Sequence, residues 1–237
     1  METATKYQPR VLRGRTELWV PHDDREIAFA HPSVGPNNYR DVGAQILQAG
    51  QQVPTGDYTA SLIHAAYCSK AKDEPEFKNA RDIMRGRWLW VFNRNGWTSK
   101  GVYVVQDREA IGRSQPLDIK DLERKLKGGK EIQGVRFSKD GRIRFAPKES
   151  YVLGERTPEQ LAKDGFMIAS YNVEGAEKCA EASATKRYKP RTYGVNVSDE
   201  EDIEQRVSAV IVSDDRLRFD GDGWLDGYDN GSAFGVL

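Results

Sequence analysis

The sequence predicts a mixed α+β fold in which short helices surround antiparallel sheets. The chain has 237 residues, of which 38% are hydrophobic and 30% charged, as in ordinary globular proteins. Its apolar segments are short, and their spacing changes between about two and about 3.6 residues along the chain. Clusters of Gly, Pro, Asn and Asp separate these segments, and no low-complexity linker interrupts them. We therefore expect one domain over residues 1–237.

The first part of the chain predicts two strands followed by a helix. Leu18–Pro21 is a short apolar strand that ends at proline, and Glu26–Phe29 is a second strand. Gly35–Asn38 has the composition of a turn. A helix is expected over Tyr39–Ala49, because Gly50 follows the last residue with helical spacing.

Capping residues predict three more helices. Asp57 is placed to cap a helix with an apolar face. Pro75 suits the first turn of a helix over Glu76–Arg85. Asp118 is expected to cap a helix that ends at Leu126, before two glycines. The apolar face of the first of these helices consists of Tyr58, Leu62, Ala65 and Ala66.

Two hairpins follow from pairs of apolar segments. Trp88–Phe92 is too short for a buried helix, and Val102–Val105 follows it, so we predict a buried hairpin with its turn over Asn93–Gly101. Ile132–Phe137 and Arg142–Phe145 flank a Lys-Asp-Gly turn and predict a second hairpin.

The last third of the chain contains alternating signals. Thr157, Pro158 and Glu159 carry the capping chemistry of a short helix. The remaining expected elements are a strand over Phe166–Ser170, a helix over Glu174–Ser183 and a strand over Arg206–Val212.

Composition argues against several classes of function. The 36 basic and 36 acidic residues cancel, so the excess positive charge that nucleic-acid binding usually requires is missing. No stretch approaches the ~20 apolar residues of a membrane span, so no membrane insertion is expected. The N-terminus lacks the apolar segment of a secretory signal, which predicts synthesis in the cytoplasm and is compatible with display on a virus particle. Cys68 and Cys179 are too few for a disulfide framework. We expect buried thiols, and a single bridge between them stays open.

Residues that could carry catalysis are few. His64 and Cys68 lie four apart on one predicted helix, and a Cys/His pair can supply a nucleophile and a base. A packed histidine beside a buried thiol fits this apolar helix better. His22–Asp24 and His31 lack the ligand spacing of a zinc site. We therefore expect no catalytic site, no metal site and no cofactor.

The tryptophans divide into two groups. Trp88 and Trp90 alternate with apolar neighbours, which predicts core packing. Trp97 lies among Gly and Asn residues and is expected to be an exposed contact.

The last 32 residues, Arg206–Leu237, differ in composition from the rest of the chain. They contain no Lys, Glu, Gln or Met, whereas about seven would be expected from the 45 in the preceding 205 residues. All six acids in this tail are Asp. Asp, Asn and Gly favour tight turns between short strands. Short polar groups interleaved with aromatics also form contact surfaces at a low cost in side-chain entropy. We therefore expect function in residues 206–237.

This composition and the terminal segment Ala233–Val236 resemble the variable proteins of diversity-generating retroelements, most of all those of archaeal viruses. In that family, adenine-directed mutagenesis rewrites Asn codons into many residue types, but never Lys, Glu, Gln, Met or Trp. Trp224 is the one exception in the tail, which implies an invariant position. The resemblance covers about the last tenth of the chain, and Arg85–Asn95 and Gly101–Asp107 resemble the same proteins more weakly. It implies a C-type lectin-like fold with a hypervariable ligand-binding face.

The resemblance also implies roles for individual residues. The partner would be a variable target such as a cell-surface receptor or another macromolecule. The ligand contacts, expected to be exposed, are Ser213, Asp214, Arg218, Asp220, Asp222, Gly223, Leu225, Gly227, Tyr228, Asp229 and Ser232. The fixed scaffold positions are Arg216, Leu217, Trp224, Gly231, Ala233, Phe234, Gly235 and Val236, of which Trp224 and Phe234 would anchor the tail in the core.

Two alternative functions are open at this point. The first is a calcium-dependent carbohydrate-binding module, because the spacing of aspartates over Asp220–Asp226 resembles a calcium loop. However, the twelfth position of that loop is Gly231 where an EF-hand needs Glu. A lectin-like fold alone does not imply sugar binding. The second alternative is a hydrolase that uses His64 and Cys68.

Overall fold

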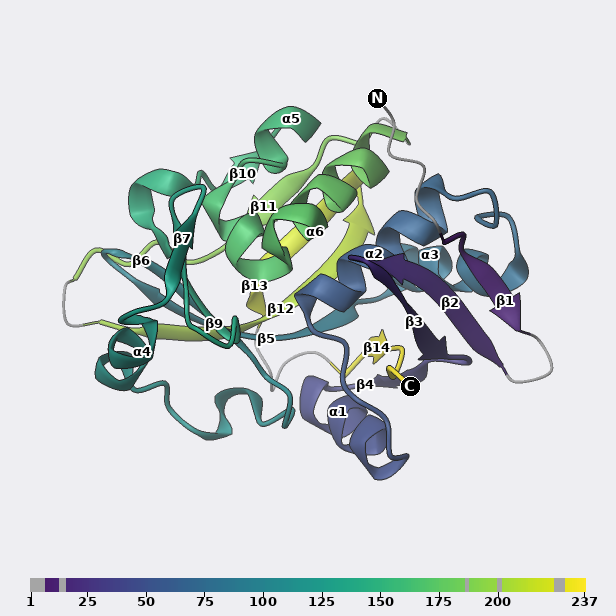
Figure 1. Ribbon diagram of the computed structural model, residues 1–237, viewed down its shortest axis with the longest axis horizontal. Coiled ribbons are helices and arrows are strands. Elements are labelled where there is room, and N and C mark those ends of the chain that lie inside the picture. The colour runs from purple at the N-terminus through teal and green to yellow at the C-terminus, as the bar shows by residue number, and fades with distance from the viewer. Residues whose placement is uncertain (1–6, 13–15, 186–187, 200–201, 224–228) are drawn as a thin grey trace.

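A long mixed β-sheet runs through the molecule (Figure 1). The computed structural model describes residues 7–12, 16–185, 188–199, 202–223 and 229–237. The strands of this sheet are β4 (Val34–Asn37), β5 (Leu89–Thr98), β6 (Gly101–Gln106), β7 (Lys130–Ile132), β8 (Val135–Phe137), β9 (Ile143–Pro147), β10 (Gly154–Glu155), β11 (Arg191–Tyr193), β12 (Glu204–Ser213), β13 (Arg216–Gly223) and β14 (Gly231–Ala233). Their order is β10-β11-β13-β12-β5-β6-β9-β8-β7, and β14 joins β4 to β5. Neighbouring strands are antiparallel except in the pairs β11–β13 and β14–β5.

A small sheet packs beside the C-terminal residues. It contains β1 (Arg10–Leu12), β2 (Glu17–His22) and β3 (Arg25–Ala30), joined as antiparallel neighbours. The backbone N–H of Ala30 donates to Gly235 O at 2.8 Å, and that of Leu237 donates to Ala28 O at 2.9 Å. Figure 1 shows the C-terminus next to β3 and β4. The last residues therefore connect the small sheet to the long one.

Six α-helices cover the sheets within the described residues. They are α1 (Tyr39–Gln48), α2 (Gly56–Cys68), α3 (Pro75–Gly86), α4 (Ile119–Leu126), α5 (Pro158–Leu161) and α6 (Gly165–Thr185), with single 3₁₀ turns at Gly112–Ser114 and Lys148–Ser150. α2 and α6 pack against each other, and α3 lies beside α2. α6 is kinked at Asn172, whose φ is +59°.

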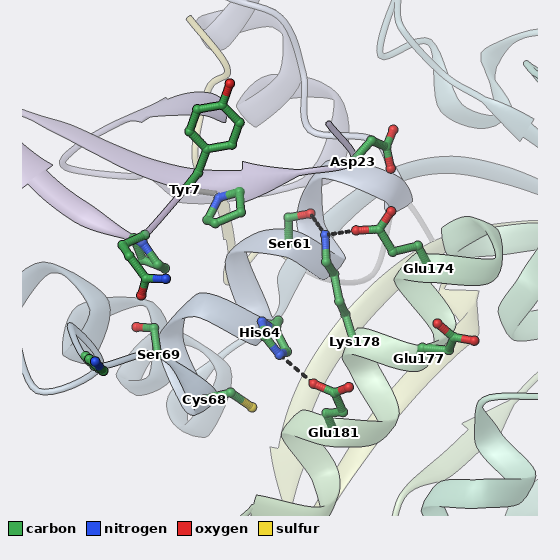
Figure 2. Close-up of a pocket in the computed structure, with 14 residues that line it drawn as sticks. Tyr7, Asp23, Ser61, His64, Cys68, Ser69, Glu174, Glu177, Lys178 and Glu181 are labelled. Carbon is green, nitrogen blue, oxygen red and sulfur yellow. Dashed lines mark hydrogen bonds and ion pairs between the residues drawn. The ribbon is translucent and has the colours of Figure 1, made fainter. Parts of the chain in front are cut away.

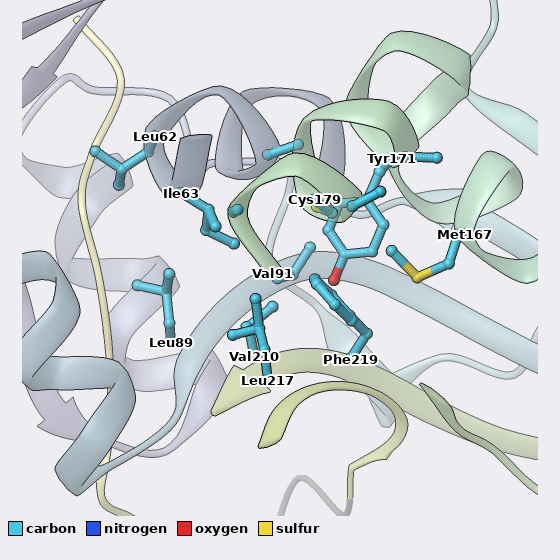
Figure 3. Close-up of a cluster of buried hydrophobic side chains, with 14 of the residues drawn as sticks. Leu62, Ile63, Leu89, Val91, Met167, Tyr171, Cys179, Val210, Leu217 and Phe219 are labelled. Atoms are coloured by element: carbon cyan, nitrogen blue, oxygen red, sulfur yellow. The ribbon is translucent and has the colours of Figure 1, made fainter. Parts of the chain in front are cut away.

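The two faces of the long sheet carry separate cores, because successive side chains of a strand point to opposite faces. Val91 joins the large core beneath α2, α3 and α6, which Figure 3 shows in close-up. Its neighbours Trp90 and Phe92 pack on the other face against Tyr39 of α1. A third cluster packs α4 against the end of the sheet formed by β6 and β9.

Most predicted elements are confirmed, including the mixed α+β class. The helix expected at Tyr39–Ala49 is α1, and Asp118 caps α4 by accepting from the N–H groups of Lys120 and Asp121. α5 begins with a complete capping box between Thr157 and Gln160. Both hairpins are present as β5–β6 and β8–β9.

Five local predictions are wrong. Ile132–Phe137 is not one strand, because β7 ends at Ile132 and β8 begins at Val135. Gly35–Asn38 is not a turn, because Val34–Asn37 forms β4 and pairs with β14. The turn of the first hairpin is shorter than Asn93–Gly101, since β5 continues to Thr98. Phe166–Ser170 belongs to α6, because an apolar run that is buried on all sides does not distinguish a strand from a helix. α2 begins at Gly56 after Thr55, so Asp57 is inside the helix and pairs with Arg144 instead of capping.

Both cysteines are free thiols, so the bridge between Cys68 and Cys179 is not formed. Cys179 is buried as expected, whereas Cys68 is only half-buried. Among the described helices, none is long and apolar enough to cross a membrane.

Candidate functional site

The residues of β13 alternate between the large core and the open face of the sheet. Leu217 and Phe219 are fully buried in the core beneath α6, and Phe219 contacts Tyr171 edge-to-face. Arg216 and Arg218 therefore point to the opposite face of the sheet. The register agrees, because Asp220 lies opposite Ala209, which lies opposite Trp90. This outward side of β13 is continuous with the face on which α1 packs further along the sheet.

Arg218 is the centre of a side-chain cluster on this outward face. Its guanidinium carbon lies 4.0 Å from the ring centroid of Tyr193 on β11 and 5.8 Å from that of Trp88. Arg191 is the cross-strand neighbour of Arg218, and its guanidinium carbon lies 4.7 Å from the centroid of the same Tyr193 ring. The Arg218 side chain is 24% exposed. We call Trp88, Arg191, Tyr193 and Arg218 the arginine–aromatic cluster.

Two arginines of this face have an acidic neighbour. Arg218 Nη2 is 3.3 Å from Asp220 Oδ2, and Arg216 Nε is 3.6 Å from Glu155 Oε2. The face therefore carries charges of both signs.

Asp220 is the most unusual group of this face, because it is only 1% exposed. Burial raises the pKa of Asp220 to about 7, although Arg218 acts in the opposite direction. Its Oδ1 has no hydrogen-bond partner among the described residues. Burial also raises the pKa of the neighbouring Asp222. A buried carboxyl with a free oxygen is costly when it is ionised.

The predicted ligand contacts divide into three groups. Asp214 and Asp229 are exposed, and Ser213, Arg218 and Asp222 are half-buried, so these five can reach a partner. Asp220, Gly223 and Ser232 are buried, so the prediction that they are exposed is wrong. A short or polar side chain does not by itself make these three residues exposed. Asp220 lies beneath Arg218, Gly223 packs on Val207, and Ser232 is held in β14 against β5. Leu225, Gly227 and Tyr228 lie outside the described residues.

Most predicted scaffold positions are buried. A side chain at Gly231 would overlap the Trp90 ring, with its Cβ 2.1 Å from Nε1, and one at Gly235 would come within 1.9 Å of Gln51 Oε1. Phe234 is fully buried, as predicted for an anchor. Arg216 is half-exposed and pairs with Glu155, and Trp224 lies outside the described residues. Buried as expected are Leu217, Gly231, Ala233, Phe234, Gly235 and Val236.

The predictions for the three tryptophans in and next to β5 are only partly correct. Trp97 is not an exposed contact, because it is 0% exposed and its indole N–H donates to Gly221 O at 2.8 Å. Its ring also packs against Phe166 of α6. Trp90 is buried as predicted, but Trp88 is only half-buried and belongs to the arginine–aromatic cluster.

A cavity of about 550 Å³ lies between α2, α6 and the turn from β2 to β3, and it contains His64 and Cys68 (Figure 2). His64 Nε2 is 2.7 Å from Glu181 Oε2, so this histidine contacts a carboxylate and is not packed in the core as expected. Cys68 Sγ contacts Thr185 Oγ1 at 3.4 Å, and burial raises the pKa of the thiol. A protonated thiol that contacts Thr185 does not form an activated pair with His64.

Metal chemistry has little basis in the described residues. Among them, no group of three or more His, Cys, Asp or Glu is arranged to hold a metal ion. The calcium alternative at Asp220–Asp226 lies partly outside the described residues.

Sequence reasoning named Arg218, Asp220 and Asp222 of the open face as contacts, but it missed Arg191 and Tyr193. One row of outward side chains on β13 was visible in the sequence. Charged residues alternate there with apolar residues or glycines, at Arg216, Arg218, Asp220 and Asp222. Tyr193 and Arg191 had no such signal, because their position depends on the parallel pairing of β11 with β13.

Comparisons with known proteins identify no relative of this chain. No protein-family model matches it. No curated protein and no solved structure matches it significantly.

Proposed function

We propose that this protein is a ligand-binding display protein whose contact face is the outward side of β11 and β13 with the segment that follows β13. The observation that carries the proposal is the arrangement of Arg218, which is half-buried and stacked on Tyr193 beside Trp88. Arg, Tyr and Trp dominate the binding energy of protein interfaces. Here they are held by their neighbours before any partner binds, which lowers the entropy cost of association.

The target class that fits this face is a protein surface such as a cell-surface receptor. The face lies on strands of a sheet, and paired charges surround its aromatic centre. Macromolecular interfaces have this composition, with an aromatic and arginine centre and a polar rim. Aspartates at the rim, such as Asp214 and Asp229, would set charge selectivity more than affinity.

We propose further that the scaffold is C-type lectin-like and that the tail is diversified by a retroelement. Two observations support this proposal. The terminal segment Ala233–Val236 is buried, as a fixed segment has to be. Its residues also bond to β3, so the tail is anchored beyond the stretch that would vary. The residues that would vary precede this fixed segment in the chain.

A pair of displayed libraries tests the binding proposal. The first library randomises three outward positions, Ser213, Arg218 and Asp222. The matched library randomises the inward positions Leu217, Phe219 and Gly221 of the same strand. Both are selected against one defined protein, lysozyme, and each selected clone is checked by thermal melting.

The outward library should yield folded clones that bind lysozyme, and the inward library should yield unfolded clones. The inward clones should fail because a Cβ at position 221 would lie 2.4 Å from the Phe166 ring. If the outward library unfolds as often as the inward one, or yields no binders, the outward side of β13 is not a display face.

A further inference from the structure

The cavity between α2 and α6 contains a serine that the display face does not explain. Ser61 lies in the middle of α2, and its Oγ is 3.0 Å from His22 Nδ1 and 3.0 Å from Lys178 Nζ. Ser61 lines the cavity, and His22 is buried next to it at 5% exposure. Figure 2 shows Ser61, Lys178 and Glu174 joined by two contacts at the side of the cavity. The two polar groups that contact Oγ come from β2 and α6.

The ammonium group of Lys178 can only donate, so Ser61 Oγ accepts from it. In the His22 tautomer that a base at this position requires, Nδ1 accepts from the Ser61 hydroxyl. The His22 proton then lies on Nε2, which is 3.6 Å from Asp23 Oδ2. Tyr58 holds the imidazole edge-to-face, with ring centroids 4.9 Å apart.

The charges around this group favour a neutral base and a polarised hydroxyl. Burial and, after it, the charge of Lys178 lower the pKa of His22, so its Nδ1 lone pair is free near pH 7. Burial and, after it, a hydrogen bond to Glu174 raise the pKa of Asp23 to about 6. Lys178 Nζ is 2.6 Å from Glu174 Oε1, and this pair holds the ammonium group beside Ser61.

We infer that Ser61 is the nucleophile of an acyl-transfer site in which His22 is the general base, Asp23 orients His22, and Lys178 stabilises the developing oxyanion. The substrate class is a small carboxylic ester that fits a cavity of about 550 Å³. Carboxylates of Glu177 and Glu181 line the same cavity, so a neutral or cationic ester fits better than an anionic one.

The reaction balances without any further group. Ser61 Oγ forms a bond to the carbonyl carbon while its proton moves to His22 Nδ1. The bond from that carbon to the alcohol oxygen breaks, and His22 returns the proton to the alcohol. Water then attacks the acyl–Ser61 ester by the same route and releases the carboxylic acid. This proposed activity is independent of the display face and is an alternative to the expectation that the protein has no catalytic site.

Labelling with a fluorophosphonate tests the inference, because this probe phosphonylates activated serines with loss of fluoride. The folded full-length protein should gain one adduct, and peptide mapping should place it on Ser61. Ser61→Ala should gain none, and His22→Gln should react at least about a hundredfold more slowly than wild type. Thermal melts establish that each variant is folded. The wild-type protein should also release a burst of p-nitrophenol from p-nitrophenyl acetate that Ser61→Ala lacks.

Two matched controls come from the same cavity. Ser69 also lines it, but its hydroxyl donates to Ala65 O at 2.6 Å, and His64 pairs with Glu181. Ser69→Ala and His64→Gln should both label at the wild-type rate. The inference is overturned if folded wild-type protein gains no adduct, if the adduct is on another residue, or if His22→Gln labels as fast as wild type. None of these results would affect the library test of the display face.

Discussion

The two sides of β13 differ in what they require of a residue, although they alternate along one eight-residue strand. The inward side, Leu217 and Phe219, is fully buried beneath α6. Inward Gly221 has no room for a Cβ beside the rings of Phe166 and Trp97. The outward side carries charged residues, of which Arg216 and Arg218 are half-buried and pair with Glu155 and Asp220. One strand can therefore hold a fixed core and present a replaceable surface, because the two functions use different positions.

The largest expected effect is on the inward side. Phe219→Ala should lower the free energy of unfolding by ~3–5 kcal/mol, because it removes a fully buried aromatic side chain. Phe234→Ala in the terminal segment should cost a similar amount. Chemical denaturation measures both. A loss near zero for either variant would contradict its placement in the core.

The next effect concerns the fixed glycines of the tail. Gly231→Ala should cost ~1–3 kcal/mol, because the new Cβ would overlap the Trp90 ring and force it to move. Gly86→Ala is the matched control, since a Cβ there meets nothing within 4 Å and its φ is not positive. Denaturation of both variants compares them directly. Equal stability of the two would show that β14 is not packed on Trp90 as described.

The buried Asp220 should make the free energy of unfolding depend on pH. Because its pKa is about 7 in the folded protein and 3.8 is the ordinary value, Asp220 favours folding below about pH 3.8, and this contribution is lost as the pH rises towards 7. Asn cannot ionise, so Asp220→Asn should gain stability relative to wild type between pH 4 and pH 8, by up to ~4 kcal/mol. Denaturation at both pH values measures this difference. A variant whose relative stability falls over that range would show that Asp220 is stabilised in its ionised form.

The smallest effect is expected at the exposed positions. Asp214→Ala and Asp229→Ala should change stability by less than ~0.5 kcal/mol, because both side chains are exposed. Asp222 is half-buried, and the change in stability caused by Asp222→Ala should stay close to this range. Thermal melts of the three variants are sufficient. Unfolding of any of them would mean that the tail is a structural element at that position.

The sequence predicts local structure well where one residue has a specific chemical role. The caps at Asp118 and Thr157, and the hairpin glycine at Gly141, predict their elements correctly because each acts through the backbone nearby. Phe166–Ser170 fails because its burial comes from distant elements, which hide the period of the helix. The buried Asp220 and Trp97 fail for the same reason, since residue type and loop composition do not specify what packs above a side chain.

The sites show the same limit. Arg218 could be named as a candidate contact from the tail alone, but its contacts with Tyr193 and Trp88 depend on strand pairing across the sheet. Ser61 was not a candidate, because it gains its neighbours His22 and Lys178 only when β2, α2 and α6 come together.

The DNA beside the gene tests most directly whether β13 combines a fixed side with a diversified side. We predict a near-copy of the 3′ end of the gene, beside a reverse transcriptase gene, that differs from it only where the copy has adenine. The differences should fall in the codons of outward or exposed residues such as Ser213, Arg218 and Asp222. Codons of Leu217, Phe219 and Phe234 should be identical in the two copies. Differences spread equally over inward and outward codons, or flanking DNA with neither a near-copy nor a reverse transcriptase gene, would contradict this account.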